Sequence, residues 1–155
     1  ESSGEVGGAV KASLMLADHA QVVDGKFFIS GGGWSITGPQ PMPFALIADI
    51  KVPWHSIDRS HKLRLELLDG DGQPVMVETA ESGEQPLFVD GEFHVAPIPG
   101  IKAGSELTFP FAANIGPQPA ITPGGVYEWR LHIDGKTRDE WRVTFATRPE
   151  LAQTG

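Results

Sequence analysis

The side chains best suited to chemistry in this chain are its five histidines, and their spacing limits what they could do. A histidine metal site needs ligands that converge, such as His-x-His on one strand face or His-Glu-x-x-His on a helix. Neither pattern occurs among the five, which are His19, His55, His61, His94 and His132. The sequence therefore predicts no metal ligands, no catalytic residues and no cofactor.

One local group of oxygen and nitrogen ligands remains. Asp18 and His19 are adjacent, and Asp24 lies a short distance further along the chain. Carboxylates beside an imidazole can act in general acid–base catalysis, so these three residues are the candidates for an enzyme site assembled from loops. A polar strand end followed by a turn explains the same residues without any chemistry.

Two glycine-rich stretches resemble ligand loops but lack the required partners. Residues 31–38 read GGGWSITG, without the Lys-Ser/Thr of a phosphate loop and without the Gly-x-Ser-x-Gly of a nucleophile elbow. Residues 69–72 read DGDG, but the remaining calcium ligands of a twelve-residue loop are absent. We expect a bulge or close crossing at the first stretch and a hairpin turn at the second.

Tryptophans in proline-rich surroundings are the candidates for contact with a ligand or partner. Trp34 precedes Pro39, Pro41 and Pro43, which would make a rigid loop that presents an aromatic ring. Trp54 and His55 follow a nine-residue alternating run that would span roughly 30 Å. The two tryptophans should therefore lie at opposite ends of the domain, too far apart for one shared carbohydrate platform.

Composition excludes several classes of function. The net charge is −8, with 12 basic residues against 20 acidic ones. Nucleic acids and anionic membranes attract clustered Lys and Arg, so neither is expected as a partner. Cysteine is absent, which removes disulfides, thiolate catalysis and cysteine-based metal sites. The absence of cysteine also favours a cytoplasmic location.

The length of 155 residues suits one domain. Its first nine residues, ESSGEVGGA, have neither a basic segment nor an apolar core, so we expect a flexible leader and no signal peptide. No apolar run reaches the roughly 18–20 residues of a spanning helix. We expect a single domain over residues 10–149 and a flexible tail over 150–155.

Alternation with a period of two dominates the chain and predicts an all-β fold with little or no helix. The alternating runs are 11–17, 21–30 with a turn at Asp24-Gly25, 44–52, 62–68, 75–77, 93–95, 107–111, and a final hairpin within 125–147. About nine short strands at this spacing favour an antiparallel β-sandwich over a closed barrel. Pro110 cannot donate to a ladder, which puts its strand at a sheet edge or a bulge.

The final hairpin carries enough information to predict its register. Its apolar residues all have odd numbers: Tyr127, Trp129, Leu131, Ile133, Trp141, Val143 and Phe145. A two-residue turn at Asp134-Gly135 would send one strand's apolar residues to solvent. A three-residue loop that includes Lys136 keeps them together and opposes Trp129 with Trp141. It would also pair Glu128 with Arg142 and Arg130 with Glu140.

The entry to this hairpin favours an immunoglobulin-like sandwich. Residues 123–127 read PGGVY, which is similar to the way such domains begin their penultimate strand with a corner tyrosine. The cysteine usually found two residues after that tyrosine is here Trp129. The sandwich would therefore lack the disulfide between its sheets.

The segment 11–34, KASLMLADHAQVVDGKFFISGGGW, resembles the opening of a family of chiefly actinobacterial proteins of about this length, known only as a domain of unknown function. The similarity continues through 62–72, KLRLELLDGDG, and 127–130, YEWR. It implies a bacterial, cytoplasmic, single-domain protein, and no activity or site residue.

Three functional hypotheses follow. The first is a non-enzymatic β-sandwich that acts through protein–protein contact, as a homo-oligomer or accessory subunit. The second is a module that binds a small ligand or carbohydrate through Trp34 or Trp54. The third is an enzyme built around Asp18, His19 and Asp24.

Overall fold

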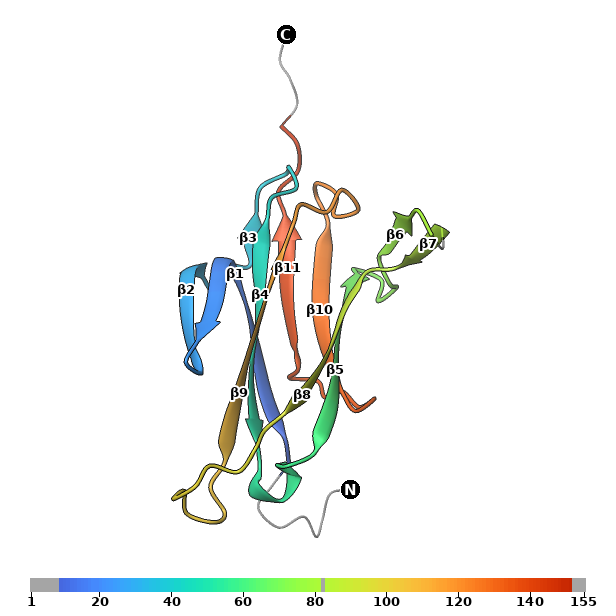
Figure 1. Cartoon of the computed structure of the whole chain (residues 1–155). Coiled ribbons are helices and arrows are strands. Elements are labelled where there is room, and N and C mark those ends of the chain that lie inside the picture. Colours follow the sequence, from blue (N-terminus) through green and yellow to red (C-terminus); the bar gives the residue numbers. More distant parts are fainter. Residues whose placement is uncertain (1–8, 82, 152–155) are drawn as a thin grey trace.

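The computed structural model describes residues 9–81 and 83–151, and these residues form an all-β protein (Figure 1). Its strands are β1 (Lys11–Val23), β2 (Lys26–Gly32), β3 (Ile36–Thr37), β4 (Phe44–Val52), β5 (Ser60–Asp69), β6 (Met76–Thr79), β7 (Gly83–Pro86), β8 (Phe88–His94), β9 (Leu107–Ile115), β10 (Val126–Ile133) and β11 (Arg142–Thr147). The one helix among the described residues is a 3-10 turn, η1 (Trp54–Ser56). The expected leader over 1–9 and tail over 150–155 lie mainly outside the described ranges.

The strands form two main sheets and a small two-stranded one. Sheet A has the order β2-β1-β4-β9, and sheet B has the order β3-β11-β10-β5-β8. Strands β6 and β7 form the third sheet, an arm that projects from the body on the right in Figure 1. All pairings are antiparallel except the short one between β3 and β11.

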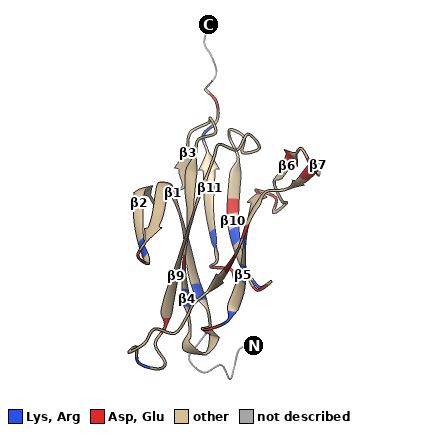
Figure 2. Ribbon diagram, viewed as in Figure 1, with Lys and Arg blue, Asp and Glu red and all other residues tan. Residues whose placement is uncertain are grey.

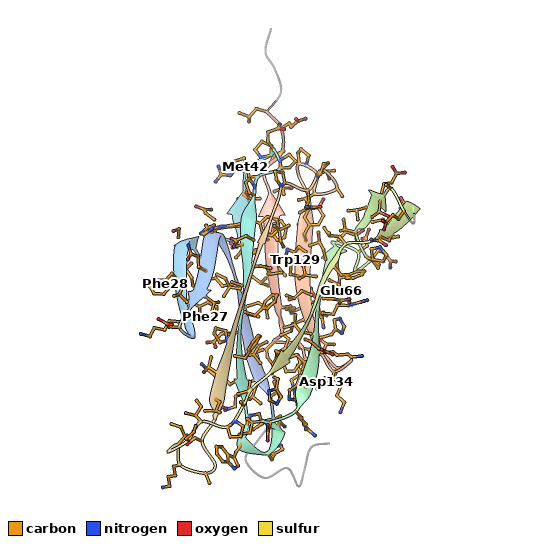
Figure 3. The ribbon with its side chains drawn as sticks, in the orientation of Figure 1. Phe27, Phe28, Met42, Glu66, Trp129 and Asp134 are labelled. Carbon is orange, nitrogen blue, oxygen red and sulfur yellow. The ribbon has the colours of Figure 1, made fainter. Side chains whose placement is uncertain are left out.

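The two main sheets share one hydrophobic core. Leu46 and Ile50 of sheet A pack in the same cluster as Leu65, Trp129 and Leu131 of sheet B, and none of the five is exposed. Period-two alternation places these side chains on the inner faces. Each buried Leu or Ile contributes about 1.5–3 kcal/mol to stability. Trp129, at the centre of Figure 3, is the largest of the fully buried side chains among the described residues.

The expectation for Pro110 is confirmed. Strand β9 is an edge of sheet A and pairs only with β4 among the described strands, with Pro110 opposite Asp49. A proline at an edge leaves no ladder bond unmade, because its missing N–H can face away from the sheet.

The predicted register of the final hairpin is wrong, although its buried face is right. The turn has two residues, Asp134 and Gly135, both at positive φ (53° and 80°), and Ile133 bridges to Lys136. A two-residue turn with positive φ at both residues matches the twist of the flanking strands, and Asp-Gly is a favoured pair for it. A bulge over residues 137–140 then shifts the pairing, so that Trp129 opposes Val143 instead of Trp141.

The bulge returns the apolar residues of both strands to the same face of the sheet, which the two-residue turn alone would not do. Thr137 Oγ1 donates to Leu131 O at 2.7 Å, and Leu131 N donates to Trp141 O at 2.9 Å. Arg130 therefore opposes Arg142, and Glu128 accepts from Arg130 Nε at 2.7 Å. The predicted pair of Arg130 with Glu140 does not form.

Candidate interaction surface

The three residues of the possible enzyme site do not converge. Asp18 and His19 are consecutive on β1, and consecutive strand residues point to opposite faces. Asp24 lies in the β1–β2 turn, about 20 Å along the strand from Asp18. No group of three metal-ligating side chains occurs among residues 9–81 and 83–151.

Trp54 and His55 form the 3-10 turn η1 directly after β4. Trp54 is half-buried and His55 is exposed. Trp34 instead packs against Phe44 at the start of β4, so the tryptophans lie at opposite ends of that strand. The structure thus separates the residues expected to contact a ligand or partner into two distant places.

Trp34 lines a pocket of about 400 Å³ with the proline-rich loop that follows it. The indole meets Phe44 and Phe145 edge to face, with ring centroids 6.4 and 6.1 Å away. It is therefore half-buried as part of a wall, and Met42, 61% exposed, is the prominent apolar side chain of the loop. The remaining wall residues are Asp18, Thr37, Gly38, Pro39, Gln40, Pro41, Pro43, Gln118, Ile121 and Thr147.

Two polar groups beside the pocket have no hydrogen-bond partner within the described chain. Trp34 Nε1 is buried and makes no hydrogen bond, and since solvent does not reach this atom, a ligand in the pocket meets the indole ring and not the donor. The Asp18 carboxylate lies against Gly31 and is exposed. The pocket therefore offers a ligand mainly apolar contacts, with the Asp18 carboxylate at its wall.

A second hollow crosses the outer face of β5, β8 and β10, and its main charges already pair with each other. Arg64 binds Asp90 through two hydrogen bonds of 2.7 and 2.9 Å. The hydrogen bond from Arg64 lowers the pKa of Asp90 and outweighs the effect of its slight desolvation. Glu66 accepts from His132 Nε2 at 2.8 Å. Lys62 and Glu92 also line the hollow, and neither side chain has a hydrogen bond or ion pair within the described chain, so the hollow holds two internal pairs and two unpaired charges of opposite sign.

The β1–β2 hairpin is the most unusual part of the fold. After Ala17, β1 stops pairing with β4 and crosses the outer face of sheet A toward β9. Ala17 and Ala20 pack there on Ala45 and Ile47 of β4, with Phe27 beside them. Small side chains allow this close crossing, so the hairpin is fixed to the sheet at its base while β2 forms the outermost strand (Figure 1).

Strand β2 exposes apolar side chains on both faces. Phe28 is 56% exposed and lies at the outer edge of the molecule in Figure 3. Ile29 and Val22 are exposed on the opposite face, and Met15 and Val23 are exposed nearby. Five of the exposed large apolar side chains in the described ranges thus gather on this hairpin and the adjoining part of β1.

The four edges of the main sheets differ in how well they are protected from pairing with another chain. Proteins protect edge strands with proline, charge or short length. Strand β9 has Pro110, β3 has two residues, and β8 carries Asp90 and Glu92. Strand β2 has seven residues, no proline and one charged residue, Lys26, next to the turn. Figure 2 shows the outer part of the hairpin largely free of charge. We call β2 and its exposed side chains the β2 edge.

The comparisons with known proteins agree with a single family over nearly the whole domain. A model of a family of unknown function, DUF6941, matches residues 12–146. The chain belongs to the DUF6941 family. No curated protein matches this DUF6941 chain. None of its described residues forms a helix long and apolar enough to cross a membrane.

Sequence reasoning on this DUF6941 chain missed the β2 edge, although a signal was present. Phe27 and Phe28 are adjacent in a strand, so only one of them can face the molecule. Phe27 packs on the crossing and Phe28 projects outward. Two consecutive aromatics beside a hairpin turn thus indicate an exposed ring, but the sequence alone does not say that the strand is an edge.

Sequence reasoning also missed His61, a buried residue that joins three segments of the chain. Its Nδ1 lies 2.7 Å from Asp134 Oδ2, and its Nε2 lies 2.8 Å from Ser56 O. The ring stacks on Phe93, with centroids 5.1 Å apart. Asp134 also accepts from Lys62 N at 2.9 Å. These contacts fix η1 and the final turn to β5, so His61 has a structural role.

Proposed function

We propose that this chain is a non-enzymatic protein that acts through protein–protein contact, and that the β2 edge is its contact surface. The observation that carries the proposal is the exposure of Phe28 on β2, which is the one long main-sheet edge without proline or acid among the described strands. An exposed edge strand offers unpaired N–H and C=O groups, and an extended segment of another chain can add to it as a further strand. The exposed apolar side chains would then be covered by the partner.

The fold that we propose for this role is an immunoglobulin-like sandwich in a bacterial, cytoplasmic protein. Tyr127 supports the fold: its hydroxyl accepts from Thr122 N at 2.9 Å, the contact made by a corner tyrosine. Two antiparallel sheets on a common core also support it. The lack of cysteine and the family resemblance favour the location.

The charge of the chain limits the kind of partner. A net charge of −8 disfavours nucleic acid and anionic membranes. Because the β2 edge is nearly uncharged, its partner should be an extended apolar protein segment. Asp18, His19 and Asp24 give no support to an enzyme, since they do not share a site.

A photo-crosslinking side chain tests the proposal in cells that make the protein. The crosslinker replaces Phe28 in one variant and Val126 in the other, which is a matched control because the two residues are 56% and 57% exposed. We expect an adduct of one defined mass from position 28, and its loss when Ile29→Asp is added. Equal yields from both positions would show that the β2 edge has no special role.

A second candidate, a module for a small ligand, is favoured by the pocket at Trp34. An apolar pocket of this size with a few polar groups is the usual form of a small-molecule site. The Trp34 ring would contact the ligand as part of the wall. Tryptophan fluorescence during a screen of sugars and small apolar acids tests this role, with Trp34→Phe as the variant that keeps an aromatic wall and removes the indole that reports binding. The absence of any saturable change with the wild type would reject it.

A further inference from the structure

We infer that the partner of the β2 edge is a second copy of this chain, with the two β2 strands antiparallel about a two-fold axis at Phe28. The inference rests on the proposed function, because it names the partner of the same edge. Such pairing would join the two β1–β2 hairpins into one four-stranded ribbon, and each hairpin continues through β1 into sheet A of its own copy. It is an isologous contact, in which both copies use the same surface.

Register follows from the requirement that opposed residues share a face of the joined sheet. With the axis at Phe28, this side chain opposes the partner's Phe28. Phe27 then opposes the partner's Ile29, and Ile29 opposes the partner's Phe27. Phe28 thus meets another exposed ring, and the exposed Ile29 meets the half-buried Phe27; cross-strand aromatic and β-branched pairs of this kind stabilise sheets.

The ends of the strand suit the same register. Beyond the apolar centre, Lys26 opposes the partner's Ser30, and Gly25 in the turn opposes the partner's Gly31. Gly32 lies further out, where the partner's Asp24 would pass. Two glycines thus stand where the partner's turn crosses the edge, and no side chain of β2 obstructs that turn.

Charge does not oppose the pairing. Lys26 is the one charged residue of β2, and it faces a serine in the paired copy. The two lysines would lie about 13 Å apart along the ladder, beyond a Debye length at physiological ionic strength. β2 holds none of the 20 acidic residues that give each copy its net charge.

The position of the hairpin leaves room for a second molecule. β2 is the outermost strand of the molecule, with β1 between it and the rest of sheet A (Figure 1). The base of the hairpin is held by the crossing on β4, so the edge is presented in a fixed orientation. A preformed edge lowers the entropy cost of association.

Native mass spectrometry and sedimentation of the full chain test the inference, with charged residues introduced at position 28, where the two copies would meet on the axis. We expect a mass of twice 16.6 kDa for the wild type. Phe28→Asp and Phe28→Lys each place like charges face to face, and each should weaken the dimer about a hundredfold. An equimolar mixture of the two variants should restore a dimer that contains one of each. Val126→Asp, matched in exposure, should leave the dimer unchanged.

The outcomes separate this inference from the proposed function. A wild type that is monomeric at concentrations well above about 10 μM overturns the second copy as partner. If the crosslinker at position 28 still gives an adduct of one defined mass in cells, and Ile29→Asp abolishes it, contact through the β2 edge stands and the partner is another protein. If the monomer gives no such adduct, both proposals fail. A dimer that neither charge variant weakens uses another surface, which overturns the second copy as the partner of the β2 edge.

Discussion

The side chain of Asn114 binds the main chain of Ala20 in both directions. Ala20 N donates to Asn114 Oδ1 at 3.2 Å, and Asn114 Nδ2 donates to Ala20 O at 2.8 Å. A side-chain amide has the donor and the acceptor of a peptide group, so Asn114 takes the place of a neighbouring strand. Through this pair, β9 holds the β1–β2 hairpin across the outer face of sheet A.

Replacing Asn114 should loosen the hairpin without unfolding the core. Asn114→Leu leaves the N–H and C=O of buried Ala20 without partners, and we expect a loss of about 1–3 kcal/mol in the free energy of unfolding. Hydrogen exchange by mass spectrometry should show faster exchange in β1 beyond Ala17 and in β2, with β10 unchanged. Asn114→Ser, which keeps one polar group, should lie between the variant and the wild type. Uniform exchange changes would contradict the local role of Asn114.

The contribution of Asp134 to stability should depend on pH. Partial burial raises the pKa of Asp134, but the hydrogen bonds from Lys62 N and His61, with the charges of His61 and Arg59, outweigh this and hold it below its ordinary 3.8. A carboxylate with a lowered folded pKa stabilises the protein above its unfolded pKa, and this contribution disappears as the pH falls through the folded value. Asp134→Asn should therefore be less stable than the wild type at neutral pH.

Denaturant titrations of both proteins at several pH values measure the effect. The difference in unfolding free energy should be constant above about pH 5 and shrink as the pH falls below about 4. A difference that stays the same down to pH 2.5 would mean that the ionised carboxylate contributes nothing beyond the neutral amide.

Tyr127 should stabilise the corner mainly through the backbone of Thr122. Tyr127→Phe keeps the ring contact with Phe145, at 5.5 Å between centroids, and removes the acceptor for Thr122 N. Leaving a partly buried N–H without a partner should cost about 1–3 kcal/mol. Thr122→Val, which removes only the 3.1 Å contact between the hydroxyls, should cost less. Thermal unfolding of both variants measures the difference, and an equal loss would assign the stability to the hydroxyl pair.

Gly31 should tolerate substitution less well than Gly33. Both have positive φ, 60° and 87°, so alanine is strained at either position. A Cβ at Gly31 would also collide with the Asp18 carboxylate, whereas a Cβ at Gly33 would meet no atom within 4 Å. Gly31→Ala should therefore lower the melting temperature more than Gly33→Ala. Combining Gly31→Ala with Asp18→Ala should remove the difference, and its persistence would show that the collision is not the cause.

Most of the fold was predictable because alternation fixes which residues are buried. The strands 44–52, 62–68 and 107–111, the edge position of Pro110 and the turn at Asp24-Gly25 all follow from local pattern and turn chemistry. Eleven described strands replace the expected nine or so, since β3 and β7 are short and have no apolar alternation of their own. The bulge over residues 137–140 escaped prediction. The requirement that the odd-numbered apolar residues share one face is met equally by a three-residue loop and by a tight turn followed by a bulge.

The candidate surfaces were less predictable because they depend on which strands become neighbours. Trp34 was expected to be presented by a rigid loop, but Phe44 and Phe145 come from two different sheets and turn its ring into a pocket wall. The importance of Phe28 depends on β2 lying at an edge, which only the order of sheet A decides. Asn114 has no sequence signal, because its partner lies 94 residues away.

Strand β1 also has a mechanical consequence. Its first seven residues, Lys11 to Ala17, are paired with β4, and the same continuous strand then leaves the sheet as half of the hairpin. A pull on the hairpin along β1 would load those seven pairs together in shear, whereas a pull at right angles would open them one after another. A force applied at Phe28 along the strand is thus transmitted through β1 to its pairing with β4 in the centre of sheet A. The hairpin is therefore mechanically coupled to the sheet.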